Sequence, residues 1–420
     1  MVDLYRICII NQYAGHPLHG MEYRPFFISK ELKAKGYDTL IITSSFSHLR
    51  RNQFNLKWYQ LFSFKTIDGV SYLIIRNIRY KKNGVRRALG LLIFSIQSFL
   101  AVALLRSHDI YIASSTHTLD FFPLVFVKTF YLRSRIIFEP HDLWPLTLTA
   151  GGFLSKKNPF VKLLQYGEDW FCRNSDAVIS MHPLNNIHLE SRGLLPGSFF
   201  HIPNGISVSE FRSYEDCNFT LDDSITDFVK SFDFVIVYAG SISDSNGFLQ
   251  LIDCARLCQT MKLNFGFIFF GGGNKLDVFK SKINNMRNVY YGGSVPRSYL
   301  ASIYALVDVG FCGFIHSPLY AYGISPNKIW EYMYYKLPIL LMVDSPNDPV
   351  SESQCGLTVT TYDPIDLVTA LEKLFLLKQN SQLEQMGNNG FRHVIRNNTY
   401  DVISNSFITV FKHVFDGKRS

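Results

Sequence analysis

The sequence predicts an α/β protein made of two doubly wound, Rossmann-like domains that face a central cleft. Apolar, strand-like runs alternate with helical stretches along most of the 420 residues. The alternation stops near residues 205–230, where polar residues and the acidic pair Asp222 and Asp223 replace the apolar runs, and it then starts again. Because strands that alternate with helices form parallel sheets with helices on both faces, the two stretches predict two sheets in tandem.

The composition agrees with a folded chain that has an anionic partner. Hydrophobic residues make up 47% of the chain and aromatic residues 15%, which is enough for a core in each domain and excludes disorder. The formal net charge of +8 suits a nucleotide, a phospholipid surface or nucleic acid, and charge alone does not choose among them or exclude a merely soluble basic protein. The seven cysteines contain no C-x-x-C pair, so they indicate neither a zinc site nor a disulfide framework, and a cytoplasmic setting fits best.

The elements follow in order along the chain. The predicted strands of the first domain are residues 6–10, 38–43, 109–114, 135–139, 177–181 and 199–203, with a first helix at 22–36. Those of the second domain are residues 234–240, 266–273, 288–293, 309–314 and 336–343, with a helix at 248–261. We therefore expect domains at 1–205 and 206–395, and a C-terminal helix at 396–420 that packs back on the first domain.

One uncharged stretch, residues 88–105, is long enough to reach the lower limit for a membrane span. Ser95, Gln97 and Ser98 interrupt it, and its two flanks have the pattern of one α/β domain, so we do not expect it to cross a bilayer. Basic residues precede it and can hold an apolar helix at an anionic membrane surface: Arg79, Lys81, Lys82, Arg86 and Arg87. An ordinary core helix after a solvated basic loop explains the same pattern.

Residues 322–340, YGISPNKIWEYMYYKLPIL, contain the strongest local signal of a ligand site. Ser325 followed by Pro326 predicts a helix start, because Ser caps free amides and Pro lacks the donor that the first turn leaves unused. The free amides and the helix dipole form an anion site, to which Lys328 in the first turn adds a positive charge.

Glu331 is the one carboxylate of this predicted helix. It lies ~7–8 Å along the helix axis from the expected anion site. A nucleoside diphosphate needs about that separation between its phosphates and its ribose, whose vicinal hydroxyls suit a carboxylate acceptor. The alternative is a surface ion pair between Lys328 and Glu331, which are three residues apart.

The segment SPNKIWEYMYYKLPIL resembles the donor-binding helix of retaining glycosyltransferases of the GT-B fold. The group in question is glycosyltransferase family 4-like, and its members build bacterial capsule, O-antigen and exopolysaccharide chains. Further matching stretches are residues 20–50, 136–148, 175–194 and 202–206, so the resemblance covers nearly the whole chain.

The resemblance implies a nucleotide-sugar donor, expected to be a UDP-sugar, whose ribose is bound by Glu331. The residues implied for its diphosphate are Ser325, Pro326, Asn327 and Lys328. Gly20, in the first strand-to-helix loop, lets backbone approach the phosphates and the reacting sugar, although a simple turn glycine explains it equally well. Gly240 and Ser241 open the equivalent loop of the second domain, whereas Gly271 to Gly273 look like a structural turn.

His141 and Asp142 follow the predicted strand at residues 135–139 directly and are expected at the edge of the first sheet. In similar enzymes a histidine occurs at this place in the topology. It can bind a sugar hydroxyl or stabilise a developing oxocarbenium ion, while Asp142 can accept a proton from the acceptor hydroxyl. The alternative is that Asp142 caps the next helix and His141 packs beside it.

Two departures from the family pattern leave other functions open. Gly323 stands where the family commonly has a first glutamate, eight residues before Glu331, and the loop at 240–248 lacks the usual Arg and Lys. A catalytically silent GT-B subunit that scaffolds or regulates a partner, or a UDP-sugar epimerase, are therefore the alternatives to a transferase.

The resemblance also implies an acceptor and a location. We expect a polysaccharide or a polyprenyl-diphosphate-linked acceptor, a reaction without metal or other cofactor, and no nucleic-acid partner. Such an acceptor places the enzyme in the cytoplasm, peripherally attached to the inner face of the cytoplasmic membrane.

Overall fold

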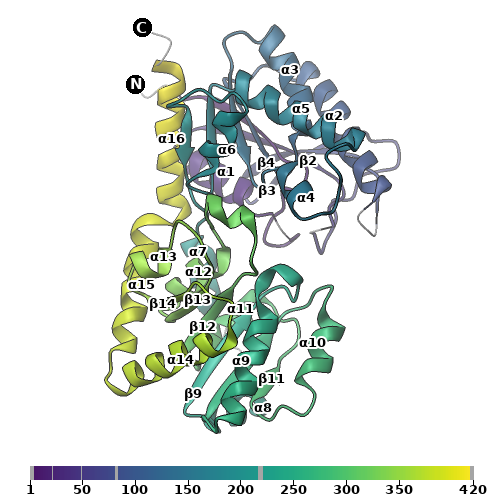
Figure 1. Cartoon of the computed structure of the whole chain (residues 1–420). Helices are drawn as coiled ribbons and strands as arrows, with labels where there is room; N and C mark the ends of the chain where they lie inside the picture. The colour runs from purple at the N-terminus through teal and green to yellow at the C-terminus, as the bar shows by residue number, and fades with distance from the viewer. Residues whose placement is uncertain (1–3, 21, 49, 81–83, 216–220, 417–420) are drawn as a thin grey trace. The chain divides into compact units, whose positions relative to one another are not determined.

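The computed structural model describes residues 4–20, 22–48, 50–80, 84–215 and 221–416 (Figure 1). The chain forms two compact units: residues Met1–Pro203 together with Tyr400–Ser420, and residues Asn204–Thr399. We call these the first and the second unit and describe each by itself. The mixed α/β architecture with two Rossmann-like sheets confirms the predicted fold class.

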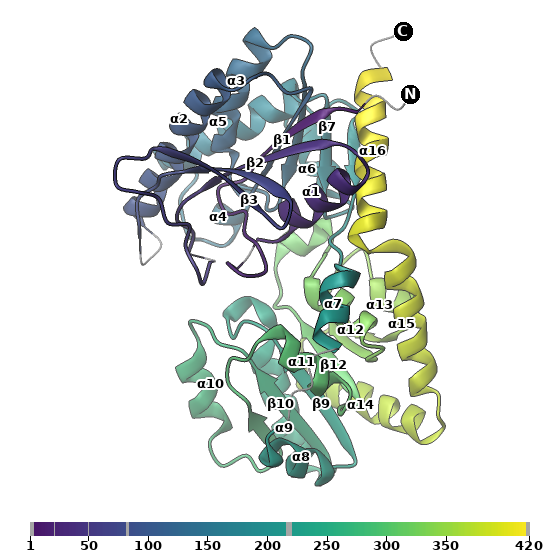
Figure 2. The same ribbon diagram turned by 180° about the vertical axis from the view of Figure 1, so that it is seen from behind.

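The first unit is built on an eight-stranded sheet with the order β3-β4-β2-β1-β5-β6-β7-β8 (Figure 2). Its strands are β1 (Arg6–Ile10), β2 (Asp38–Ser44), β3 (Phe62–Ile67), β4 (Val70–Ile75), β5 (Ile110–Ser115), β6 (Arg135–Pro140), β7 (Ala177–Ser180) and β8 (Phe199–His201). Its helices are α1 (Arg24–Ala34), α2 (Val85–Leu104), η1 (Thr118–Asp120), α3 (Phe121–Phe130), α4 (Leu146–Ala150), α5 (Pro159–Asn174), α6 (Asn185–Ser191) and α16 (Tyr400–Asp416). The strand order reverses between β1 and β5, so the carboxyl ends of these two strands mark the place where such sheets bind ligands.

One edge of this sheet differs from the prediction. Strands β3 and β4 form an antiparallel hairpin, whereas the sequence interpretation assigned neither strand. Asp68 and Gly69 form the two-residue turn, both with positive φ, and Asp-Gly between alternating residues is a strong hairpin signal that was missed.

Helix α16 packs beside α1 and completes the core on one face of the first sheet (Figures 1 and 2). Tyr400 stacks on Phe27 of α1 with ring centroids 4.9 Å apart, and Phe407 is buried in the same cluster. At the other end of the helix, Arg135 at the start of β6 donates a hydrogen bond of 2.7 Å to the carbonyl of Val414. The apolar face of this last segment is therefore part of the core of the first unit.

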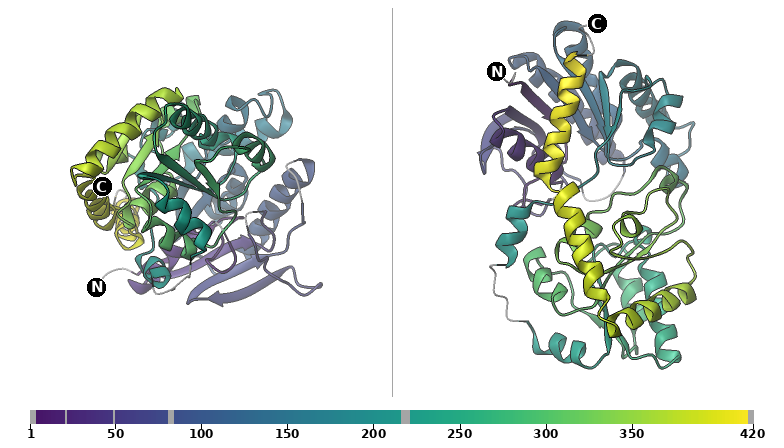
Figure 3. Two further views of the ribbon diagram at one scale, coloured as in Figure 1. Left: turned by 90° about the horizontal axis from the view of Figure 1, so that it is seen from below. Right: turned by 90° about the vertical axis from the view of Figure 1, so that its left-hand side faces the viewer.

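The second unit contains a six-stranded parallel sheet with the order β11-β10-β9-β12-β13-β14, covered by helices on both faces (Figure 3). Its strands are β9 (Phe234–Ala239), β10 (Phe265–Phe270), β11 (Val289–Tyr291), β12 (Val309–Gly313), β13 (Ile339–Met342) and β14 (Gly356–Val359). Its helices are α7 (Val208–Glu215), α8 (Asp223–Lys230), η2 (Asp244–Asn246), α9 (Phe248–Thr260), α10 (Leu276–Ile283), α11 (Arg297–Tyr304), η3 (Pro318–Tyr322), α12 (Asn327–Tyr334), α13 (Pro349–Glu352), α14 (Pro364–Gln379) and α15 (Leu383–Asn397). The strand order reverses between β9 and β12.

Alternating residues of β9 explain why its sequence is apolar throughout. Ile236 and Tyr238 enter the core that contains α9 and α14, whereas Val235 and Val237 enter the core that contains α12. A strand of a doubly covered parallel sheet buries both of its faces, so it shows a continuous apolar run.

Arg24 of α1 is a buried residue whose hydrogen bonds connect the first helix to the end of the sheet. Its Nε lies 2.9 Å from Glu139 Oε1, and its terminal nitrogens donate to the carbonyls of Ile202 and Pro203. Both charged side chains are almost fully buried. Removing one partner of such a pair leaves an uncompensated buried charge.

We predict that Arg24→Met lowers the free energy of unfolding of the first unit by ~3–5 kcal/mol. The matched control is Asp401→Asn, which removes one charge from the pair between Lys35 and an aspartate that is 65% exposed, and should cost less than ~1 kcal/mol. Chemical denaturation of both variants measures the difference. Equal losses of the free energy of unfolding in the two variants would show that burial of the Arg24–Glu139 pair does not contribute to stability.

Candidate functional site

Three of the predicted donor residues, Gly240, Ser241 and Lys328, lie together at the carboxyl end of β9 in the second unit. Gly240 and Ser241 directly follow this strand, and Lys328 on α12 reaches the same loop. A Cβ added at Gly240 would lie 2.4 Å from Lys328 Cε, so only glycine leaves room for the lysine there. This is the point where the strand order reverses, which is where open α/β sheets bind ligands.

Lys328 forms no ion pair with a carboxylate among the residues described in the second unit. Its Nζ lies 4.3 Å from the centre of the Tyr238 ring, and within the described part of the second unit it forms neither an ion pair nor a hydrogen bond. Burial lowers the pKa of this ammonium group. The expected alternative, a surface ion pair between Lys328 and Glu331, is not present, because Glu331 pairs elsewhere.

Glycines hold the loop after β10 against the loop after β9. A Cβ at Gly271 would lie 1.9 Å from the carbonyl oxygen of Gly240, and a Cβ at Gly273 would lie 2.2 Å from that of Ile242. The backbone amide of Ile242 donates to the carbonyl of Gly272 at 2.9 Å. The structural role predicted for Gly271 to Gly273 is therefore confirmed.

The start of α12 differs from the prediction that Ser325 caps it. Pro326 occupies the N-cap position without a side-chain cap, and the helix begins at Asn327, which is exposed. Ser325 Oγ accepts a hydrogen bond of 2.9 Å from the amide of Asn204, and the Asn204 side chain donates to the Ser325 carbonyl. Ser325 thus anchors the segment before the helix, and the amides of the first turn have no side-chain partner among the described residues.

Glu331 is buried, as predicted, but it is paired. Its Oε2 lies 2.8 Å from a terminal nitrogen of Arg297 on α11, and the Tyr304 hydroxyl lies 3.3 Å from its Oε1. The expectation of a carboxylate kept unpaired for a ligand is therefore wrong. Arg297 also stacks on the ring of Phe211, which fixes its direction.

Gly323 has a backbone conformation that explains part of the departure from the family pattern. Its φ is 108°, in a region that side chains rarely adopt. The neighbouring Ile324 is held at both backbone groups by Asn347, whose side chain accepts at 2.8 Å and donates at 2.9 Å. A glutamate at position 323 would be strained in this loop.

Gly20 lies in a tight turn of the first unit. Its φ is 112°, and its amide donates to the carbonyl of His16 at 2.8 Å. The geometry agrees with the alternative that Gly20 is a turn glycine. A role in ligand binding remains a prediction.

His141, at the end of β6, lies between the half-buried carboxylate of Glu22 and the buried carboxylate of Glu139. Its Nδ1 is 2.7 Å from Glu22 Oε2, its Nε2 is 2.9 Å from Ser114 Oγ, and Nε2 is 3.8 Å from Glu139 Oε2. Burial lowers the pKa of His141, but Glu22 and Glu139 outweigh this effect and raise it to about 10. The imidazole is therefore charged at neutral pH.

Glu139 completes this network, because Arg24 holds its other oxygen. Burial raises the pKa of Glu139, but Arg24 and His141 outweigh it and lower the value to about 2. His141 thus sits among ionised groups whose charges balance. The alternative that it merely packs beside a capped helix does not describe this arrangement.

Asp142 is exposed, unlike its neighbour. It does not cap α4, whose N-cap is Pro145 without a side-chain hydrogen bond. Its carboxylate is open to solvent at the carboxyl edge of the first sheet. Its catalytic role remains a prediction.

Sequence reasoning missed most of the partners of these residues. In the first unit, Glu22 and Ser114 contact His141, and Arg24 pairs with Glu139. In the second unit, Arg297 pairs with Glu331, and Asn347 holds the loop before α12. The only local signal was Glu139, two residues before His141 in the stretch FEPHD.

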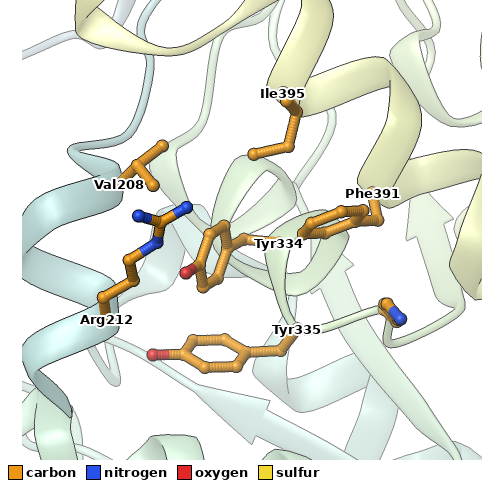
Figure 4. Close-up of a pocket in the computed structure, with 7 residues that line it drawn as sticks. Val208, Arg212, Tyr334, Tyr335, Phe391 and Ile395 are labelled. Carbon is orange, nitrogen blue, oxygen red and sulfur yellow. The ribbon is translucent and has the colours of Figure 1, made fainter. Parts of the chain in front are cut away.

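A separate hollow of about 360 Å³ lies in the second unit between α7, the end of α12 and α15 (Figure 4). It is lined by Val208, Arg212, Tyr334, Tyr335, Lys336, Phe391 and Ile395. None of the predicted donor residues lines it. Among the residues described by the structure, no group of three or more His, Cys, Asp or Glu side chains is arranged to hold a metal ion.

The predicted membrane-surface residues divide into three groups. Arg79 and Arg86 are exposed, whereas Lys81 and Lys82 lie outside the described residues. Arg87 instead turns toward the protein, where its guanidinium lies 5.7 Å from the Tyr13 ring centre and 5.6 Å from that of Trp144. Its assignment to a solvent-facing basic loop is wrong.

Comparisons with known proteins agree with this architecture. The Glycosyltransferase Family 4 model matches residues 19–210, and the model for Glycosyl transferases group 1 matches residues 233–376. No curated protein sequence matches the chain.

Solved structures similar to the chain are distant in sequence. The sucrose-phosphate synthase of Thermosynechococcus elongatus is 14% identical with a TM-score of 0.69, over 98% of this chain and 100% of that one. Anabaena HepE in complex with UDP-glucose is 12% identical with a TM-score of 0.65, over 97% and 100%. The α,α-trehalose 6-phosphate synthase of Burkholderia multivorans is 10% identical with a TM-score of 0.73, over 99% and 100%.

Two Rossmann-like units, each with functional groups where its strand order reverses, define the GT-B class of fold. The two family matches lie one in each unit and together span most of the sequence. The chain belongs to the glycosyltransferases of this fold, with a Family 4 domain followed by a group 1 domain.

We predict that the stabilising effect of His141 depends on pH. Its pKa in the folded protein, about 10, lies above the ordinary value of 6.5, so its charge stabilises the first unit fully below pH 6.5. This contribution is lost as the pH rises through about 10. The difference in melting temperature between the wild type and His141→Gln should therefore shrink across this range.

His48 provides the control for this experiment. Burial lowers its pKa to about 4, so it stays neutral throughout the same range. His48→Gln should change the melting temperature by an amount that does not vary with pH between 6.5 and 10. A His141→Gln difference that is equally constant would contradict the charged state of His141.

Proposed function

We propose that this glycosyltransferase moves a sugar from a UDP-sugar to a polysaccharide or lipid-linked oligosaccharide, with retention of the anomeric configuration and without a metal ion. The observation that carries the donor part is Lys328, an ammonium group without an ion-paired carboxylate among the described residues of the second unit, beside the glycine loop that follows β9. An enclosed cation of this kind is stabilised by an anion, and a nucleotide diphosphate supplies one.

The first turn of α12 supports the same assignment. Its amides have no side-chain cap, so they and Lys328 can both face phosphate oxygens. In the proposal, Lys328 and these amides supply the positive charge that a metal ion supplies elsewhere. Anabaena HepE in complex with UDP-glucose and an Escherichia coli relative bound with UDP-2-fluoro glucose share this fold, which supports UDP as the nucleotide.

Glu331 keeps the capacity to bind a ribose while it is paired with Arg297. A carboxylate offers about four lone-pair sites, and Arg297 and Tyr304 use two of them. Arg297 also fixes the orientation of the carboxylate. In the proposal, the remaining sites accept hydrogen bonds from the ribose hydroxyls.

On the acceptor side, the charged His141 and the exposed Asp142 support the proposal. His141 can donate a hydrogen bond to a sugar hydroxyl, and Asp142 can accept the proton of the acceptor hydroxyl. An acceptor carried on a polyprenyl diphosphate places the enzyme at the inner face of the cytoplasmic membrane, and the link to surface polysaccharide follows from the family resemblance.

Calorimetric titration with UDP, GDP and ADP in the presence of EDTA tests the donor. We expect UDP to bind to the wild type, and Lys328→Gln to weaken it by roughly tenfold or more, equivalent to ~1.4 kcal/mol. Binding of none of the three nucleotides would refute the proposal. NMR of the anomeric proton in the product distinguishes retention from inversion.

Two other functions give different results in the same assays. A silent scaffold subunit binds nucleotide but transfers sugar only when another protein is added, and an epimerase releases a sugar isomer without any acceptor. The scaffold function is favoured by the loop at 240–248, which contains no Lys or Arg.

We predict that Gly240→Ala weakens UDP binding by about tenfold or more, because the added Cβ would lie 2.4 Å from Lys328 Cε and displace the ammonium group. Gly272→Ala is the matched control: its Cβ would meet nothing within 4 Å, and its φ is not positive. Equal affinities of the two variants would show that the position of Lys328 does not matter for UDP.

A further inference from the structure

Helix α2 exposes large apolar side chains to solvent, although its buried face is also mostly apolar and contains Leu91 and Phe94. Ser95 and Ser98 are buried, and Ser95 donates a hydrogen bond of 3.0 Å to the carbonyl of Leu91. The exposed large side chains are Val85, Leu89, Ile96, Leu100 and Leu104, with exposed fractions of 86%, 48%, 52%, 49% and 80%. A surface helix of a protein that contacts only water has charged and polar residues on its exposed face, so the exposed apolar residues of α2 are unusual.

Helix α3 continues this apolar surface. It packs beside α2 (Figure 1), and Phe99 of α2 contacts Phe122 and Phe126 of α3 with ring centroids 5.6 and 5.4 Å apart. Further exposed side chains on and after α3 are Phe122, Val125, Phe130 and Leu132. These four residues and the five of α2 form what we call the α2–α3 face.

The charged residues of the two segments that form the α2–α3 face have one sign. Neither residues 77–108 nor residues 121–138 contain an aspartate or a glutamate. The exposed basic residues in these segments are Arg79, Arg86, Arg106, Lys128 and Arg133. An apolar surface with a basic and carboxylate-free border is complementary to a bilayer with anionic headgroups.

The topology excludes a helix that crosses the bilayer here. Helix α2 is the one helix in the described residues that is long and apolar enough to do so. It connects β4 to β5, and both strands belong to the same eight-stranded sheet. A span would place them on opposite sides of a membrane, so α2 can only lie along its surface.

We propose that the α2–α3 face docks on an anionic lipid bilayer, with its apolar side chains among the acyl chains and its basic border against the headgroups. The argument uses only the surface of the first unit and does not depend on the proposed donor chemistry. A lipid-linked acceptor would then meet the enzyme at the plane in which it resides.

Co-sedimentation of the full chain with phosphatidylcholine vesicles, with and without phosphatidylglycerol, tests the proposal. We expect binding to the anionic vesicles at low ionic strength and release as salt is added. Changing Leu89, Ile96, Leu100 and Phe130 together to glutamine should reduce binding on the order of a hundredfold. The matched control changes Met261, Leu306, Ile365 and Leu376 of the second unit, which are similarly exposed, and should bind like the wild type.

A second variant separates charge from apolar contact. Changing Arg79, Arg86, Arg106 and Arg133 to glutamine should reduce binding to anionic vesicles on the order of a hundredfold and remove most of its salt dependence. Both variants should titrate with UDP and melt like the wild type, which distinguishes a loss of docking from a loss of folding or of donor binding.

Several results would overturn the proposal. It is overturned by a wild type that does not bind anionic vesicles at low salt, or by a variant with Leu89, Ile96, Leu100 and Phe130 changed that binds them as well as the wild type does. Sedimentation velocity tests a third outcome. If the wild type self-associates, the variant with Leu89, Ile96, Leu100 and Phe130 changed does not, and neither protein binds vesicles, the face contacts a second copy of the chain.

Discussion

The second unit is organised around the ammonium group of Lys328, which forms no ion pair with any residue that the structure describes in that unit. Enclosing an ammonium group without a carboxylate costs free energy, which the face of the Tyr238 ring offsets only in part. Two nearby glycines leave room for this arrangement. Gly240 has no side chain that would displace Lys328, and Gly271 has none that would separate its loop from Gly240. Glu331, the carboxylate nearest in sequence, is held by Arg297. A positive charge without an ion-pair partner among the described residues of this unit therefore lies at the point where the strand order reverses.

In the first unit, by contrast, buried and half-buried carboxylates are neutralised by cations. Glu22 and Glu139 are two carboxylates in a buried region, and His141 and Arg24 neutralise them at distances of 2.7 and 2.9 Å. Because its charges balance, this network attracts neither anions nor cations strongly. Such a site suits a neutral molecule rich in hydroxyl groups, whereas the site of the second unit suits a phosphate. The proposed acceptor and donor sites thus have environments of different charge.

The sequence was sufficient for features that depend on local pattern and insufficient for those that depend on distant partners. The strand at β9 was predicted because both of its faces are apolar, and Lys328 could be placed near an anion site from the start of its helix. The partner of Glu331 could not be found, because Arg297 is 34 residues away and no spacing rule connects them. The same limit applies to Ser325, whose oxygen is used by Asn204, 121 residues earlier in the chain. The β3–β4 hairpin is different, since its Asp-Gly turn was present in the sequence and was overlooked.

The position of α16 in the first unit has a consequence for how the protein is made. The ribosome completes residues up to Pro203 long before it reaches Tyr400, yet the core against α1 contains Ile403, Phe407 and Phe411 from the last helix. Until those residues emerge, Phe26 and Phe27 of α1 lack part of their packing, while the whole second unit has already left the exit tunnel. The N-terminal unit therefore finishes folding last, which reverses the usual order for a chain of successive domains. During synthesis, a nascent chain that stops before residue 400 exposes the apolar surface that chaperones recognise.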